Sequence, residues 1–345
     1  MPLRTALPAV LLAALLVPVA GCLQEKEGDA PGPAARTVTA LAGQAGAGPE
    51  ATAAPSWAIG QSWTHKWTIV DGGNLTLLVK TVVAEAADGG WTLATDNQTI
   101  AAFHGAFVFP TLGRFTPGLL QTAGPTRFPW YHFPLTANAT WSDTAVLYDG
   151  VKDTQVDVQG RVVSVQRGPS TVYTVELTTG DRLLARYDYD AHTQWFNDAT
   201  FYGQDGKPDF TVQMQETGRG FKGRLYDDTG VPLLNHFSLL APAAGEAQPR
   251  PSADFMMAAD QNRLLVFLFS FAAGGAHDSE LIAPDGTRHS ALSVDAVAAP
   301  VHDDGRILLL PGQAGTWRVA TAGAGAFAAG AYVAAYGLHE RTIDL

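Results

Sequence analysis

Short runs of alternating apolar and polar residues, separated by Gly, Asp and Asn, fill most of this 345-residue chain after Trp57. In the run 62–70, Trp63, His65 and Trp67 fall on one face, while threonines and a lysine fall on the other. A period of two is typical of a half-buried β-strand. No segment repeats its apolar residues every 3.6 positions over three turns, which disfavours a parallel sheet with crossover helices. We therefore expect an all-β chain of antiparallel strands.

The same pattern predicts further strands on both sides of a segment rich in Pro and Ala at 242–251. Turn signals such as Asp88-Gly89-Gly90 and Asp205-Gly206 separate them. The additional strands are expected at 75–86, 90–95, 160–166, 171–178, 182–189, 195–202, 210–215, 254–259, 264–272, 280–283, 306–310, 316–321 and 331–337.

Composition divides the chain into five parts. Residues 1–21 are expected to be a signal peptide. Residues 22–55, rich in Ala, Gly and Pro, are expected to be a disordered linker, because they hold too few large apolar residues to form a core. An antiparallel sheet or half-barrel is expected over 56–241, a linker over 242–251, and a small jelly-roll-like β-sandwich over 252–345.

The N-terminus has the layout of a secretory signal, with Arg4 before an apolar stretch at 6–20 and small residues before Cys22. The stretch is too short to span a bilayer comfortably, and Pro8 and Pro18 interrupt it. The segment Val-Ala-Gly-Cys resembles the lipobox of bacterial and archaeal lipoproteins. That resemblance implies cleavage between Gly21 and Cys22, a lipid on Cys22, and an extracytoplasmic protein anchored to the outer face of the membrane. An uncleaved anchor, or an ordinary signal with a chance cysteine, is the alternative.

Cys22 is the only cysteine, so the exported chain has no disulfide framework and no thiolate metal site. The chain carries 33 acidic and 22 basic residues, with no basic cluster. A nucleic-acid partner is therefore excluded, and contact with the membrane is expected only through the lipid.

Two groups of landmarks resemble known domains. The spacing Trp57, Gly60, Trp63, with Phe133-Pro134-Leu135 and Trp141 later, resembles secreted β-rich domains of uncharacterised function and the lipoprotein-carrier half-barrels, which cradle acyl chains. The segments at 281–286 and 311–319 resemble the pre-peptidase C-terminal jelly-roll domains. The second resemblance implies a sandwich module that accompanies other domains without catalysis of its own.

Nothing in the chain matches a catalytic motif, so no catalytic residue is assigned. The most suggestive binding feature is the aromatic cluster Trp130, Tyr131, His132 and Phe133, between two prolines. Aromatics on a stiff loop can form a platform for sugars, lipids or peptides. The alternative, which we favour, is that they fill the open end of the sheet as core.

Two further kinds of site are possible. Asp278, His302, Asp303 and Asp304 are the best metal-ligand group; they would suit Ca²⁺, although hairpin turns explain them as well. No other cofactor is expected. Asn74, Asn97 and Asn138 each begin an Asn-x-Thr sequon, which marks them as candidate glycosylation sites.

These observations predict a membrane-anchored lipoprotein that acts as a non-catalytic binding or presentation module for a polymer, peptide or lipid. An envelope polymer or a surface protein is the expected partner. The alternative is a structural or accessory subunit of a cell-envelope complex. A hydrolase is the least favoured class, although two suitably placed carboxylates would be enough for one.

Overall fold

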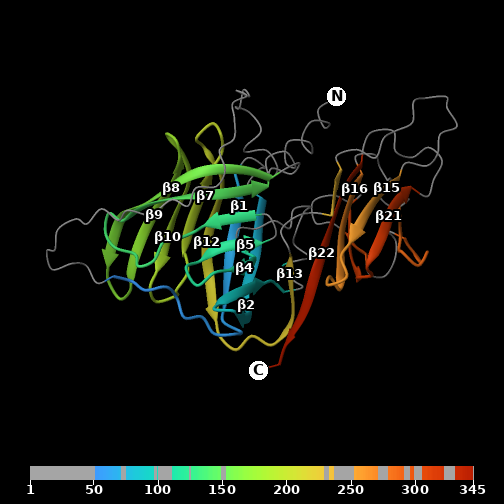
Figure 1. The fold of residues 1–345 in the computed structure, drawn as a ribbon, viewed down its shortest axis with the longest axis horizontal. Helices are drawn as coiled ribbons and strands as arrows, with labels where there is room; N and C mark the ends of the chain where they lie inside the picture. The colour runs from blue at the N-terminus through green and yellow to red at the C-terminus, as the bar shows by residue number, and fades with distance from the viewer. Residues whose placement is uncertain are drawn as a thin grey trace, which may run out of the picture.

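The computed structural model describes residues 51–70, 75–96, 99, 111–123, 126–148, 153–228, 233–236, 252–270, 279–290, 296–298, 305–321 and 331–344. The regular structure of this part consists of twenty-two β-strands (Figure 1). All the strand pairs are antiparallel, so the expected all-β, antiparallel fold is confirmed.

Twelve strands form a closed barrel in which each strand pairs with its neighbours in sequence and β12 returns to pair with β1. Its strands are β1 (Ser62–Ile69), β2 (Leu75–Ala87), β3 (Gly90–Ala94), β4 (Gly113–Phe115), β5 (Leu120–Ala123), β6 (Thr126–Pro129), β7 (Thr140–Tyr148), β8 (Asp153–Arg167), β9 (Thr171–Thr179), β10 (Arg182–Asp190), β11 (Asp198–Tyr202) and β12 (Pro208–Gly218). Such a meander needs only tight turns: Asp88 and Gly89, between β2 and β3, have φ of 52° and 75°, the left-handed region that these residues tolerate.

The alternation in β1 sets its inner and outer faces. Trp63, His65 and Trp67 are buried, whereas Thr64 and Lys66 between them are only partly buried. The neighbouring strands repeat the pattern, because side chains that face each other across an antiparallel pair lie on the same side of the sheet. The barrel interior is therefore lined by large apolar and aromatic side chains.

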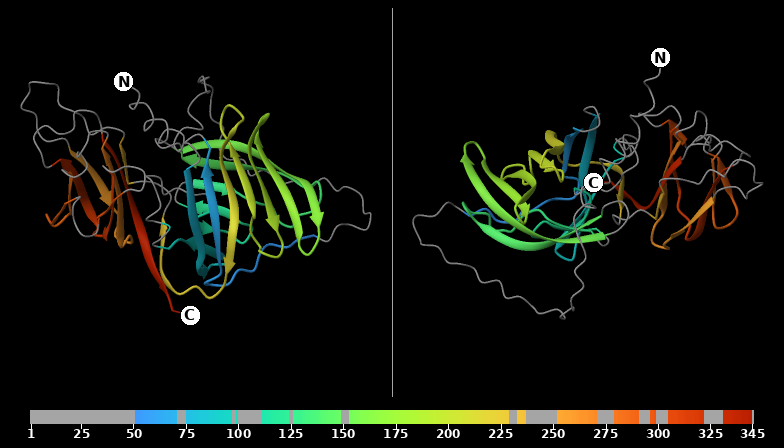
Figure 2. Two further views of the ribbon diagram at one scale, coloured as in Figure 1. Left: turned by 180° about the vertical axis from the view of Figure 1, so that it is seen from behind. Right: turned by 90° about the horizontal axis from the view of Figure 1, so that it is seen from above.

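Two smaller sheets make up the rest of the described chain, beside the barrel (Figure 2). The six-stranded sheet has the order β13-β22-β16-β20-β19, with β14 also paired to β22, and the four-stranded sheet has the order β15-β21-β17-β18. Their strands are β13 (Gly223–Asp228), β14 (Leu234–His236), β15 (Ser252–Met257), β16 (Arg263–Ser270), β17 (Ser279–Ile282), β18 (Arg288–Ser290), β19 (Ala296–Ala298), β20 (Gly305–Pro311), β21 (Gly315–Thr321) and β22 (Ala331–Ile343).

Strand β16 is buried on both faces, which explains its unbroken apolar sequence Leu-Leu-Val-Phe-Leu. Leu264, Val266 and Leu268 pack in one cluster with Phe255 and Trp317 of the four-stranded sheet. The intervening Leu265 and Phe267 belong instead to the hydrophobic cluster of the barrel. The six-stranded sheet thus contributes one face to each of two cores.

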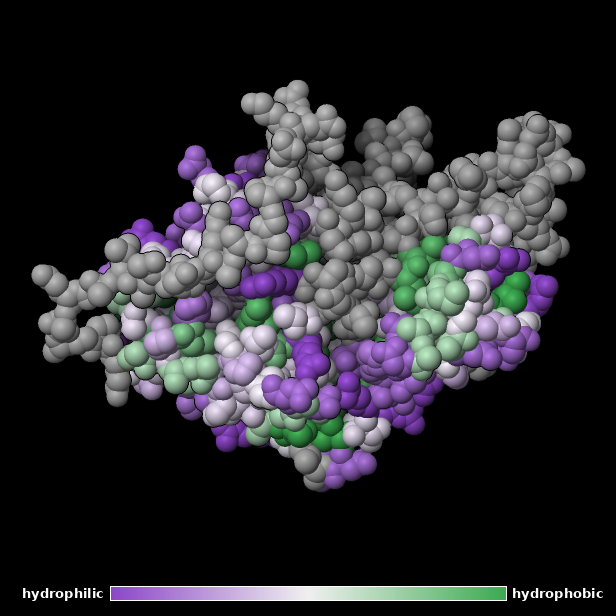
Figure 3. Space-filling view, in the orientation of Figure 1, coloured by the Kyte–Doolittle hydropathy of each residue, from purple (hydrophilic) through white to green (hydrophobic). Residues whose placement is uncertain are grey.

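A direct junction links the barrel to the six-stranded sheet. Thr95, directly after β3, and Tyr226 of β13 form an isolated β-bridge with N···O distances of 2.9 and 2.8 Å. Beside it, Leu225 and Ile343 pack with Val82 and Ala94 in a separate apolar cluster. On the face shown in Figure 3, hydrophilic residues lie along the lower part of the boundary between the barrel and the smaller sheets.

The chain leaves the barrel after β12 and enters the six-stranded sheet with β13, which begins at Gly223. β13 and β14 precede the expected linker at 242–251 but pair with β22 at the far end of the chain. The expected linker itself lies outside the described residues, as does the part of the expected N-terminal linker before residue 51.

Candidate functional site: the filled barrel and its rim

The connection between β10 and β11 folds into the barrel. We call residues 191–197 the plug loop. The expected strand at 195–202 is wrong for its first three residues, since β11 begins only at Asp198. Trp195 and Phe196 are both fully buried, although neighbouring residues of a strand would point to opposite faces. The loop therefore contributes two consecutive aromatic side chains to the core.

Side chains of the N-terminal segment and of β1 hold the plug loop through its carbonyl groups. The indole N–H of Trp57 donates to the carbonyl oxygen of Gln194, and that of Trp63 donates to Thr193, both at 3.0 Å. His65 Nε2 lies 3.1 Å from the carbonyl oxygen of Phe196. Burial lowers the pKa of His65 to about 4, so the ring is neutral at pH 7. Because a carbonyl oxygen only accepts, Nε2 must carry the proton.

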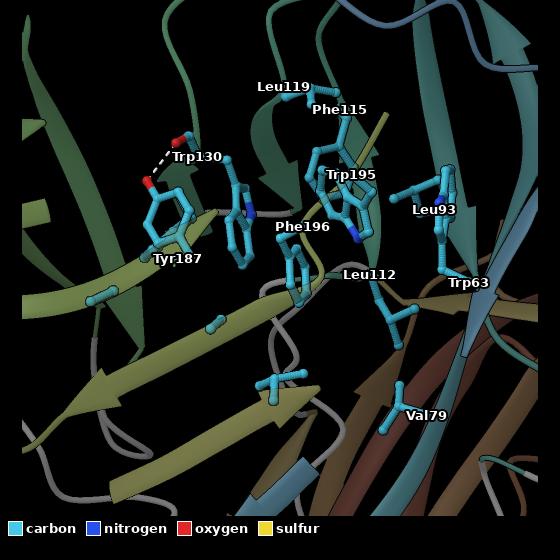
Figure 4. Packing of buried hydrophobic residues seen from close by; sticks show 14 of the residues in the cluster. Trp63, Val79, Leu93, Leu112, Phe115, Leu119, Trp130, Tyr187, Trp195 and Phe196 are labelled. Carbon is cyan, nitrogen blue, oxygen red and sulfur yellow. Dashed lines mark hydrogen bonds between the residues drawn. The ribbon is translucent and has the colours of Figure 1, made fainter. Parts of the chain in front are cut away.

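Aromatic rings surround the two buried plug residues (Figure 4). The ring of Phe196 lies flat against Trp130, with centroids 5.1 Å apart and an interplanar angle of 5°. The His65 ring also stacks on Phe196, with a centroid distance of 4.4 Å. The centroid of Trp195 lies 5.1 Å from that of Trp57 and 5.4 Å from that of Trp130. Close aromatic pairs of this kind stabilise a core beyond the burial of their area. Both aromatic side chains of the plug loop thus pack directly against Trp130.

Two aspartates on the outer side of β10 fix the ends of the plug loop. Asp188 Oδ1 accepts the backbone N–H groups of Asn197 at 2.6 Å and Asp198 at 3.2 Å. Asp190 accepts the backbone N–H of His192 and the side-chain amide of Asn197, both at 2.8 Å, and the hydroxyl of Ser170.

The environments of the two aspartates push their pKa values apart. Burial raises the pKa of Asp188 to about 6, against the two amide N–H groups that favour its charged form. Burial alone would raise the pKa of Asp190 as well, but hydrogen bonds from Ser170, Asn197 and His192 lower it below its usual value. A carboxylate pair of this kind is also a feature of acid–base catalysis. Here both carboxyl groups accept hydrogen bonds from the plug loop, and Asp190 accepts one from Ser170 as well. We therefore interpret the two aspartates as anchors of the loop.

Sequence reasoning missed these anchors. The segment Tyr187-Asp188-Tyr189-Asp190 has the alternation of an ordinary strand with polar residues outside. The only local signal was the polar stretch His192-Thr193-Gln194 before two aromatics, which is also typical of a hairpin turn.

The four candidate aromatics divide into buried and exposed residues. Trp130 is fully buried, and its carbonyl oxygen accepts the hydroxyl of Tyr187. Tyr131 is also buried, and its hydroxyl donates to the carbonyl oxygen of Asp188. His132 is exposed and Phe133 is partly buried. Residues 132–134, which we call the rim loop, are thus the part of the candidate cluster that solvent reaches.

The rim loop rests on the barrel through aromatic contacts. The His132 ring stacks on Trp141, with centroids 6.3 Å apart and an interplanar angle of 23°. Trp141 in turn lies over Gly160 of β8, where an added Cβ would be 2.0 Å from indole Cε2. Phe133 packs edge-on against Tyr189 at 5.1 Å. The loop therefore presents an imidazole ring on a rigid aromatic support.

Other candidate sites fall mostly outside the described residues. This applies to Gly21 and Cys22 of the lipobox, to Asp278, His302, Asp303 and Asp304, and to Asn74 and Asn97. Asn138 is described and exposed. Within the described ranges, no group of three or more His, Cys, Asp or Glu side chains is arranged to hold a metal ion. The described part also contains no helix that is long and apolar enough to cross a membrane.

Comparisons with known proteins give no family. No family model and no curated protein matches the chain. The chain is similar to two solved structures of PNGF-II, one in the P21 and one in the C2 space group. The TM-scores are 0.25 and 0.24 and the sequence identities 7% and 8%. The matches cover 82% and 81% of this chain, and 68% and 66% of the respective PNGF-II chains. Similarity at this level supports no inference about fold or function.

Proposed function

We propose that this protein is a lipid-anchored, extracytoplasmic binding module whose rim loop contacts a polymer or peptide of the cell envelope. In this account the barrel is a non-catalytic scaffold. The lipobox-like segment ending at Cys22 supports the anchor, and the absence of other cysteines agrees with a fold held by its hydrophobic core.

One observation carries the choice of contact site. The aromatic residues inside the barrel are packed against the plug loop, whereas His132 is exposed on top of Trp141. An exposed ring on a rigid support can stack on a sugar face or a proline ring at little entropic cost. These contacts favour binding at the rim over binding of an acyl chain in the interior.

The position of the chain's entry agrees with this arrangement. Thr52 forms a β-bridge with Leu135, with N···O distances of 3.1 and 3.0 Å. The chain that arrives from Cys22 therefore reaches the barrel next to the rim loop.

Membrane attachment is tested by fractionation of cells that express the full chain or its Cys22→Ser variant. We expect the wild type to partition into the detergent phase and the variant to appear in the soluble extracytoplasmic fraction. Equal detergent partitioning of the two would contradict the lipid anchor.

Binding at the rim is tested separately with a lipid-free protein that lacks residues 1–21 and carries Cys22→Ser. It is sedimented with purified envelope polymer from the source organism, as the wild-type rim and as the double variant His132→Ala, Phe133→Ser. Leu78→Ser is the matched control, because Leu78 is 57% exposed on the barrel. We expect at least about tenfold weaker binding for the rim variant alone, since two contact side chains are lost. Undiminished binding of the rim variant would disprove the assignment.

A further inference from the structure

A short turn joins the rim loop to β7. The backbone N–H of Ala139 donates to the carbonyl oxygen of Thr136 at 3.2 Å, and Asn138 lies at the tip with a φ of 60°. Asparagine is one of the few residues other than glycine that adopts this left-handed conformation readily. Asn138 therefore fits the backbone conformation of the turn, and the turn holds it at an exposed position.

The three residues Asn138-Ala139-Thr140 form a sequon that the proposed function does not use. Ala139 is partly buried, and its carbonyl oxygen accepts the backbone N–H of Val162 at 2.9 Å. Asn138 and Thr140 are both exposed. No described residue forms a hydrogen bond with either of their side chains. The middle of the sequon is thus fixed to the barrel, while the acceptor amide and the hydroxyl two residues later are open.

We propose that Asn138 is an N-glycosylation site, modified by an oligosaccharide from a lipid-phosphate-linked donor outside the cytoplasm. In the reaction, a bond forms between Asn138 Nδ2 and C1 of the first sugar. The bond between that C1 and the phosphate oxygen of the donor breaks. The lipid phosphate leaves with the bonding electrons, and the amide loses one proton to a base. No redox change is involved, and the donor supplies the only co-reactant.

The fold leaves room for such a glycan. Asn138 is at the end of the barrel rather than along a strand, so a chain of sugars can extend into solvent without displacing a neighbouring strand. Trp141, one residue after the sequon, supports His132 of the rim loop. The glycan would therefore lie beside the rim loop. The inference itself is independent of what the rim loop binds.

The test is mass spectrometry of the exported protein purified from its native host. We expect the peptide containing Asn138 to carry an added hexose-based mass that collision removes as sugar units. Thr140→Val should abolish the added mass on this peptide, whereas Thr140→Ser, which keeps the hydroxyl, should retain it.

Two controls separate modification from folding. Asn138→Gly removes the acceptor but suits the positive φ, so it should yield folded protein without the added mass. Circular dichroism of each variant verifies the β-sheet content. An unmodified Asn138 peptide in the wild type would overturn the proposal, and so would an added mass that persists in Thr140→Val.

Discussion

At the scale of single residues, the most unusual group is Asp188, whose carboxyl is largely buried yet lies next to two other acids. Its raised pKa means that the folded protein holds a proton there more tightly than the unfolded chain does. That proton stabilises the folded state at pH values below the ordinary carboxyl pKa, and this stabilisation is lost as pH rises toward 6.

Asp188→Asn tests this effect of pH on stability. The amide keeps a carbonyl oxygen for the N–H groups of Asn197 and Asp198 but cannot ionise. Relative to the wild type, the variant should therefore gain on the order of 1–2 kcal/mol in unfolding free energy between pH 4 and pH 7, after allowance for partial solvent exposure. Urea unfolding followed by tryptophan fluorescence at the two pH values measures this difference. An identical pH dependence in both proteins would show that Asp188 is not desolvated as described.

Gly160→Ala tests the close packing of Trp141 on β8. The new methyl group would overlap the Trp141 indole, so the indole must move. This movement also disturbs the stacking of His132 on Trp141. We expect a loss of about 1–3 kcal/mol in unfolding free energy, typical of overpacking. Gly168→Ala is the control, because its nearest contact would be an ordinary 3.8 Å. Equal stability of the two variants would mean that the indole does not rest on Gly160.

At the scale of elements, the plug loop is the feature on which the barrel core depends. Its Trp195 and Phe196 belong to the same hydrophobic cluster as the inner side chains of the barrel strands. The lining side chains just fill the interior of a barrel of about eight strands. A barrel of twelve strands has a wider interior, so its lining side chains alone leave more space.

Trp195→Ala should convert part of this core into an apolar cavity. We expect the variant to lose about 3–5 kcal/mol of stability and to bind a small apolar molecule such as indole. Thermal unfolding with and without indole measures both effects, with indole raising the Tm of the variant only. Tyr202→Ala, at a partly buried site of β11, is the control. An equal rise in Tm for the wild type would show that the interior already accommodates a ligand.

The elements also show what could be predicted from sequence. β1 and β9 alternate throughout and β10 alternates from Ala185 to Tyr189, and the positions of these three strands were predicted within about two residues. β4, β5 and β6 contain only three or four residues each, too few for a period to appear. The inward fold of the plug loop was not predictable, because its burial depends on hydrogen bonds from Trp57 and Trp63, more than a hundred residues away. The sequence likewise could not show that Trp130 and Tyr131 are core residues whereas His132 is exposed, because their burial depends on contacts with residues far away in the sequence.

At the scale of the whole molecule, the barrel and the six-stranded sheet are joined by both backbone and side-chain contacts. Arg341 of β22 donates to Glu85 of β2 at 2.7 Å and to Asp227 of β13 at 2.9 Å. His339 Nδ1 lies 3.6 Å from Asp227 Oδ2, and this neighbouring carboxylate raises the pKa of the histidine. These contacts predict that the two units unfold together, although composition alone suggested separate domains.

Arg341→Met tests this coupling. The change removes the ion pair with Glu85, which crosses from the six-stranded sheet to the barrel. It also leaves the buried carboxylate of Asp227 without its arginine partner, and the two losses together should cost about 1–3 kcal/mol. Differential scanning calorimetry should show one transition for the wild type, and a lower Tm or two separated transitions for the variant. Arg318→Met, which breaks an exposed ion pair with Asp254, should have a much smaller effect. A wild type that already unfolds in two steps would contradict the coupling.

The plug loop packs inside the barrel, and we therefore propose that the protein functions through the outside of the molecule. Hydrogen–deuterium exchange of the peptide that covers residues 191–197 tests this packing most directly, since the N–H groups of His192, Gln194 and Asn197 are all hydrogen-bonded. We predict exchange about two orders of magnitude slower than in the exposed turn at 204–207, comparable to that of the barrel strands. Exchange as fast as in that turn would mean that the loop is open, and would contradict the account.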